Sequence, residues 1–203
     1  MSKYNTDRSF TDSVHWNLAM KLIYEPMTWT AVTMKKEQAR KIDMDDGIDY
    51  VFLDENGQLK TVQERFREAK YLEYNDFTIR YRRDENIHAE RRASEFYKIK
   101  ADYFVYGITN GYKAITPPTD FLKFAVIDLK FVQQQIEAGK IQIKENQKTK
   151  TCFIENEILI CPVNENIDGS SNFFPIDIQL LVQIWGNKVV RFERGFLNLA
   201  ISQ

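Results

Sequence analysis

The stretch GIDYVFLDENGQLKTVQERFR, residues 47–67, decides the fold of this chain. It holds two runs rich in β-branched and aromatic residues, and the pair Asn56-Gly57 lies between them. This arrangement predicts a β-hairpin. Because further strand-like runs alternate with helical patterns along the chain, we expect an α/β fold in which helices flank a mixed β-sheet.

The length of the hairpin turn sets the register of its two strands. A three-residue turn, with Gly57 in the left-handed conformation, places Asp49 opposite Gln63. A two-residue turn places Asp49 opposite Glu64 instead, and a four-residue turn places it opposite Val62. With the three-residue turn, alternation along the strands gathers an acid, an amide and two guanidinium groups on one face of the hairpin.

The other expected elements follow from hydrophobic periodicity and from breaker residues. A first helix is expected over 10–24, with Thr11 or Asp12 as its N-cap and Pro26 beyond its end. The run 103–107 has few charges and is expected to be a central strand, covered on both faces. Further strands are expected at 29–34, 77–83 and 121–129, a late hairpin at 151–155 and 157–163, and helices at 35–41, 94–100, 132–138 and from Pro175 to 184.

The composition is that of an ordinary globular domain. With 203 residues, 43% hydrophobic and a net charge of −1, the chain can bury one core, which excludes disordered and collagen-like classes. We expect one domain over 1–203, with a core at about 10–129 and a C-terminal extension of a hairpin and a helix at about 130–203. The N-terminus lacks an export signal and no apolar run reaches about 20 residues, so a cytoplasmic protein without membrane contact is expected.

The cysteine and histidine residues give little sign of chemistry. Cys152 and Cys161 fall on the two arms of the late hairpin, and reduced structural thiols are expected rather than a disulfide or a redox pair. His15 and His88 have no Cys or His neighbour at the spacing of a zinc site.

Asp49 is the residue that most needs an explanation, because an acid within an apolar strand must be paired, solvated or bound to a metal. It could form a cross-strand ion pair with Arg65, or it could face water at a sheet edge. It could also bind Mg²⁺ together with the side-chain oxygen of Gln63. The nearby Asp43, Asp45 and Asp46 lack the spacing of a calcium loop and are expected to form a solvated acidic turn.

The hairpin resembles the core of the PD-(D/E)XK nuclease superfamily. The residues that carry the resemblance are GIDYVF at 47–52 and TVQERFR at 61–67. The segment YKIKADYFVY at 97–106 also resembles the helix and strand that follow the motif in that superfamily. The likeness covers about 10–129, and it implies a restriction-endonuclease-like core and Mg²⁺-dependent phosphodiester hydrolysis.

Carried over to this chain, the resemblance makes Asp49 and Gln63 the metal ligands and puts Arg65 at the position of the catalytic lysine. Mg²⁺ or Mn²⁺ is the implied cofactor. Gln63 supplies a neutral oxygen where most members have an acid, and Arg65 stays protonated, so it can stabilise a phosphate but cannot act as a base. Glu64 could compensate if the register places it beside Asp49, and it completes the candidate catalytic set.

Nucleic acid is the expected partner, with DNA favoured over RNA. Basic residues outnumber acidic ones between residues 60 and 100, and alternation in FTIRYR at 77–82 separates the arginines from the apolar side chains. If this strand pairs beside the hairpin, a cationic stripe for phosphates results. A polar face neutralised by Glu68, Glu73 and Asp76 is the alternative. The residues of the stripe are Arg65, Arg67, Arg80 and Arg82.

Two functions therefore compete. The first is a Mg²⁺-dependent nuclease centred on Asp49. The second is a catalytically inactive module that keeps the fold and binds nucleic acid or an acidic protein partner. An enzyme of another kind is disfavoured, because the sequence contains no nucleophile with a base, no phosphate loop and no dinucleotide motif. Activity of the Gln-x-Arg variant and a homodimeric assembly are left open.

Overall fold

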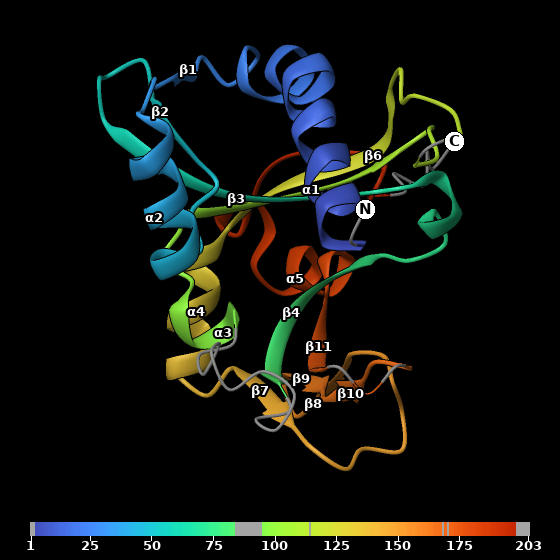
Figure 1. Ribbon diagram of the computed structural model, residues 1–203. Coiled ribbons are helices and arrows are strands. Elements are labelled where there is room, and N and C mark those ends of the chain that lie inside the picture. The colour runs from blue at the N-terminus through green and yellow to red at the C-terminus, as the bar shows by residue number, and fades with distance from the viewer. Residues whose placement is uncertain (1–2, 84–94, 114, 168, 170, 198–203) are drawn as a thin grey trace, which may run out of the picture.

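A six-stranded mixed sheet forms the centre of the computed structural model, which describes residues 3–83, 95–113, 115–167, 169 and 171–197 (Figure 1). In this sheet β3 and β5 are parallel, and the other neighbouring strands are antiparallel. Helices pack on the sheet, so the predicted α/β class with a mixed sheet flanked by helices is confirmed. In spatial order the strands are β1 (Thr30–Ala31), β2 (Tyr50–Leu53), β3 (Leu59–Arg67), β5 (Tyr103–Thr109), β6 (Phe121–Asp128) and β12 (Val190–Arg194).

The β2–β3 hairpin has the three-residue turn. Tyr50 pairs with Val62, and Gly57 has φ +72°, a conformation that a glycine adopts without strain. The Asp54 carboxylate accepts hydrogen bonds from the backbone N–H groups of Asn56 (3.0 Å) and Gln58 (2.9 Å), which fixes the turn. Continued by one residue, this register sets Asp49 opposite Gln63.

A long helix covers one face of the sheet. It runs through α1 (Lys3–Val14) and continues as a π-helix, η1 (His15–Tyr24), packed over β2, β3, β5 and β6. The expected helix is confirmed, but Thr11 and Asp12 lie inside it and are not its N-cap. Its buried residues meet an aromatic cluster in which the Tyr24 and Phe52 rings stack at 4.1 Å.

The second face carries the larger part of the core. Phe104, Tyr106 and Ile127 point into it, whereas Val105 is buried on the helix-covered face, which confirms that β5 is a central strand buried on both faces. Gly139, with φ +70°, follows the end of the predicted helix over 132–138. The helices that pack against this core are α2 (Lys36–Asp46), α3 (Glu95–Lys98), α4 (Leu129–Glu137) and α5 (Ile178–Trp185).

Strand β4 (Asp76–Arg83) does not pair beside the hairpin, so that expectation is wrong. A short turn of 3₁₀ helix, η2 (Ala69–Tyr71), separates it from β3, and β4 pairs with β11 (Ser171–Asp177) instead. Phe77 and Ile79 are buried in the same core as Phe174 and Ile176 of β11. Shared burial of these four side chains explains why β4 leaves the central sheet.

The C-terminal part of the chain contributes residues to the hydrophobic core. The late hairpin is confirmed as β8 (Phe153–Glu155) and β9 (Ile158–Pro162), and the two thiols near it, Cys152 and Cys161, are unoxidised with their Sγ atoms 3.8 Å apart. The helix expected from Pro175 begins only at α5, because Asp177 caps it by accepting the N–H of Leu180 at 2.9 Å. The remaining elements are β7 (Ile141–Lys144), β10 (Asn164–Glu165) and the 3₁₀ turn η3 (Gly186–Lys188).

None of the helices in the described ranges is both long and apolar enough to cross a membrane.

Candidate functional site

Asp49 lies at the point where the hairpin joins the sheet. β2 begins one residue later, and the Asp49 Oδ2 atom accepts the backbone N–H of Glu64 at 2.8 Å. The carboxylate thus extends the hydrogen bonding of β3 beyond the start of β2. This contact fixes the half-buried carboxylate against β3, close to the side chains that β3 presents.

Glu95 at the start of α3 gathers the polar side chains of β3. Its Oε1 atom accepts hydrogen bonds from Gln63 Nε2 at 2.7 Å and from the Arg65 guanidinium at 2.6 Å. Its Oε2 atom accepts the backbone N–H of Arg80 at 3.0 Å. The Glu95 side chain is only 5% exposed and that of Arg65 22%, so this is a largely buried ion pair that links β3, β4 and α3.

Further contacts hold the Arg65 guanidinium in place. It donates to the backbone carbonyl of Thr78 and to its hydroxyl, and it lies 5.7 Å from the centre of the Phe104 ring. Burial alone would lower the pKa of Arg65, but the attraction of Glu95, with a smaller contribution from Asp49, raises it above the ordinary value. The main ion-pair partner of Arg65 is thus Glu95, and not Asp49 as the sequence allowed.

The Glu95 carboxylate is ionised in the folded protein. Burial opposes its ionisation, but the charge of Arg65 and the hydrogen bonds from Arg65 and Arg80 outweigh burial and hold the pKa of Glu95 below its ordinary value.

We expect the stability that Glu95 confers to depend on pH. A depressed pKa contributes stability that is present above the unfolded-state value, about 4.3, and is lost as the pH falls through the folded-state value. The difference in unfolding free energy between the wild type and Glu95→Gln should therefore shrink below about pH 4. Urea denaturation of both proteins from pH 7 to pH 3 measures it, and a constant difference would contradict the assignment. Because both proteins share the raised pKa values of Asp76 and Asp177, the effect of those two groups cancels.

The Gln63 side chain carries an unused acceptor. Its Oε1 atom is buried and has no hydrogen-bond partner among the described residues. It lies under Gly47, which ends α2 with φ +63°, and a Cβ at that position would stand 3.4 Å from Oε1 and 3.3 Å from the Cα of Ile99. A buried oxygen without a donor costs free energy unless something binds it. This atom, like the buried His15 Nε2 and Glu64 Oε2 atoms, is therefore a polar atom whose partner the described residues do not supply.

The Glu64 side chain points to the opposite face of the sheet, so the register does not bring it beside Asp49, and it does not compensate for the neutral Gln63. It is fully buried there, with its Oε1 atom 2.8 Å from His15 Nδ1 and accepting the Tyr24 hydroxyl. Burial and the Glu64 charge raise the pKa of Tyr24 well above its ordinary value, which keeps its hydroxyl a donor. The His15 ring also stacks on Tyr50 at 3.5 Å. The backbone N–H of Glu64, by contrast, binds Asp49.

The arginines of the expected cationic stripe contact different neighbours. The Arg65 guanidinium binds Glu95, which accepts the backbone N–H of Arg80 in the same cluster, and the Arg67 guanidinium lies over the Tyr71 ring at 5.3 Å. Arg82 belongs to β4, but its side chain lies outside the described part of the structure.

The acidic residues upstream of Asp49 form the last turn of α2 rather than a separate turn. Asp46 pairs with Lys100 at 2.7 Å, and Lys98 Nζ donates to the backbone carbonyls of Asp43 (3.3 Å) and Met44 (2.9 Å). Lys100 thus neutralises part of this charge, and both lysines join α2 to the segment that carries Glu95.

Within the described ranges, no three His, Cys, Asp or Glu side chains gather as a metal site. The hairpin offers the Asp49 carboxylate and the Gln63 amide oxygen, both of them ligand types that hard cations accept. Glu95 instead faces the Gln63 amide nitrogen and Arg65.

Comparison of the chain with protein-family models, with curated proteins and with solved structures finds no match.

Proposed function

We propose that this protein is a nuclease-like domain that hydrolyses phosphodiester bonds in nucleic acid with the help of Mg²⁺ or Mn²⁺ at Asp49 and Gln63. The observation that carries the proposal is the buried, unpartnered Oε1 atom of Gln63, which shares the hairpin with the Asp49 carboxylate. After the intervening β4, the chain continues with the short helix α3 and then with β5, which is parallel to β3, an order that supports a restriction-endonuclease-like core.

The residues of the hairpin would have different roles in this hydrolysis. Asp49 and Gln63 would hold the cation, which when bound supplies a Lewis acid for a phosphoryl oxygen and a more acidic water. Arg65 remains charged and keeps further N–H donors for a phosphate, so it stabilises negative charge that develops there. Glu95 orients Arg65 and holds the Gln63 amide so that its nitrogen, and not its oxygen, faces the ion pair.

A second function is favoured by the same ion pair. In this structure Glu95 already occupies the amide nitrogen of Gln63 and part of the Arg65 guanidinium, which is an arrangement that suits a structural role. A catalytically inactive module that binds nucleic acid or an acidic protein is therefore the alternative.

Asp49→Asn should lower cleavage at least about a hundredfold, as expected for losing a charged group that acts on the transition state. The assay incubates single- and double-stranded DNA and RNA with the full chain in Mg²⁺ or Mn²⁺, beside an EDTA control, and DNA is expected to be cut in preference to RNA. Asp45→Asn removes the same charge from an exposed position on α2 and should leave cleavage unchanged.

Each outcome separates the two functions. Cleavage that Asp49→Asn and EDTA both abolish supports the nuclease. Folded protein that binds nucleic acid in a salt-sensitive manner without cutting it supports the inactive module. Undiminished cleavage by Asp49→Asn would overturn the assignment of the site.

A further inference from the structure

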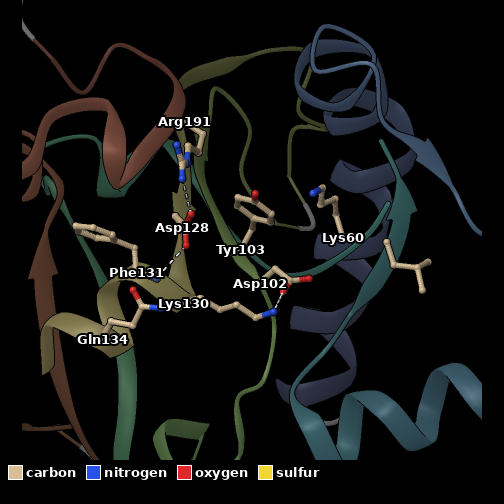
Figure 2. Close-up of a pocket in the computed structure, with 9 residues that line it drawn as sticks. Lys60, Asp102, Tyr103, Asp128, Lys130, Phe131, Gln134 and Arg191 are labelled. Atoms are coloured by element: carbon tan, nitrogen blue, oxygen red, sulfur yellow. Dashed lines mark hydrogen bonds and ion pairs between the residues drawn. The ribbon is translucent and has the colours of Figure 1, made fainter. Parts of the chain in front are cut away.

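A cavity of about 380 Å³ opens at one end of the central sheet, where β3 and β5 begin and β6 ends against α4 (Figure 2). Its volume lies in the range of sites for small ligands. Most of its wall is polar, and five of its side chains carry a charge. The residues that line it are Leu59, Lys60, Asp102, Tyr103, Asp128, Lys130, Phe131, Gln134 and Arg191.

The two acids of the cavity already have protein partners on both oxygens. Asp102 accepts the N–H and the hydroxyl of Thr61 at 2.8 and 2.7 Å, and its other oxygen pairs with Lys130. Asp128 caps α4 through the N–H of Phe131 at 2.9 Å, and its other oxygen pairs with Arg191 at 2.8 Å. Burial disfavours ionisation of Asp102, but Lys130 and Thr61 outweigh it and lower the pKa. These carboxylates serve to place the cations.

The cationic side chains of the cavity, by contrast, have more N–H donors than the two acids occupy. An ammonium group has three N–H donors and a guanidinium has five, and each acid occupies only one or two of them. The Lys130 side chain is 61% exposed and that of Arg191 45%, so both reach the open side of the cavity. Lys60 and the Tyr103 hydroxyl face the same space (Figure 2). Lys60 pairs with Asp54, outside the cavity lining, at 3.1 Å and donates to Gln58 at 3.2 Å, so the charges balance and the surplus lies in the N–H donors.

We propose that this cavity binds a phosphate group. A wall with surplus N–H and O–H donors suits a ligand that only accepts hydrogen bonds, and arginine and lysine both bind phosphate oxygens. A phosphate of a nucleic-acid strand is one source of such a group. A free nucleotide offers the same chemistry. Binding here does not require cleavage at Asp49.

The test is calorimetric titration of the full chain with inorganic phosphate, with thymidine 5′-monophosphate and with a short single-stranded oligodeoxynucleotide. The variant Lys130→Gln/Arg191→Gln should bind at least about tenfold more weakly, since hydrogen bonds to charged groups contribute that much or more. For the oligonucleotide, the slope of log K against log salt should fall by about 1.4 for two lost phosphate contacts.

A matched control removes the same two charges elsewhere. Lys144→Gln/Arg194→Gln breaks two surface ion pairs, with Glu155 at 3.6 Å and with Asp120 at 2.7 Å, and should change binding less than about twofold. Asp49→Asn should keep its affinity for phosphate, which distinguishes failure of this site from failure of the nuclease site.

The three ligands decide the source of the phosphate. Weaker binding of the oligonucleotide by the cavity variant identifies a subsite for a nucleic-acid strand. Weaker binding of phosphate and of the nucleotide alone identifies a site for small phosphate compounds. Absence of phosphate and nucleotide binding to the wild type, or equal losses in the control variant, would overturn the proposal.

Discussion

Replacing Glu95 with alanine is expected to lower the free energy of unfolding by about 3–5 kcal/mol, the range for breaking a buried ion pair by removing one partner. Alanine would leave the buried Arg65 guanidinium, the Gln63 amide nitrogen and the backbone N–H of Arg80 without the acceptor that they share. Urea denaturation at pH 7 with circular dichroism gives the value directly.

A surface pair provides the matched control for this prediction. Glu155→Ala removes an exposed acid that lies 3.6 Å from Lys144, and it should change stability by no more than about 0.5 kcal/mol. The double variant Arg65→Met/Glu95→Leu should regain much of the loss, because it leaves no buried charge unpaired. Equal losses for Glu95→Ala and Glu155→Ala would show that the pair is not buried in solution.

The hairpin was predictable because local chemistry determines it. The sequence Asn56-Gly57 selects a tight turn, and Asp54 closes it through two backbone N–H groups, so the register that sets Asp49 opposite Gln63 follows from a few neighbouring residues. The same holds for the central strand β5 and for the turn between β8 and β9.

The partners of the site residues were not predictable, because they depend on contacts far apart in the sequence. Glu95 lies thirty residues after Arg65, and its position at the start of α3 was the only available signal. Glu64 and His15 meet across forty-nine residues, a separation at which no local pattern links them. The predicted pairing of β4 beside the hairpin was wrong for the same reason. Its partner β11 lies near the C-terminus and completes a buried surface that local patterns do not reveal.

Replacing Gln63 with glutamate tests the metal site through stability rather than through activity. In EDTA the variant should be about 2 kcal/mol less stable than the wild type, since position 63 would lose its hydrogen bond to Glu95 and bring a second carboxylate close to it. A cation bound at the hairpin offsets this repulsion. A concentration of Mg²⁺ one hundred times the dissociation constant should then restore about 2.7 kcal/mol.

The uncharged variant Gln63→Leu separates this effect from simple loss of the hydrogen bond. It also removes the donor to Glu95, but it supplies no oxygen, so Mg²⁺ should not change its melting temperature. If Mg²⁺ stabilises Gln63→Glu no more than Gln63→Leu, the oxygen at position 63 does not face a cation, and the buried Oε1 atom loses its value as support for the nuclease. If the response is specific to glutamate, the hairpin holds a cation even where no substrate has been found, because the readout depends on the folded protein and the ion alone.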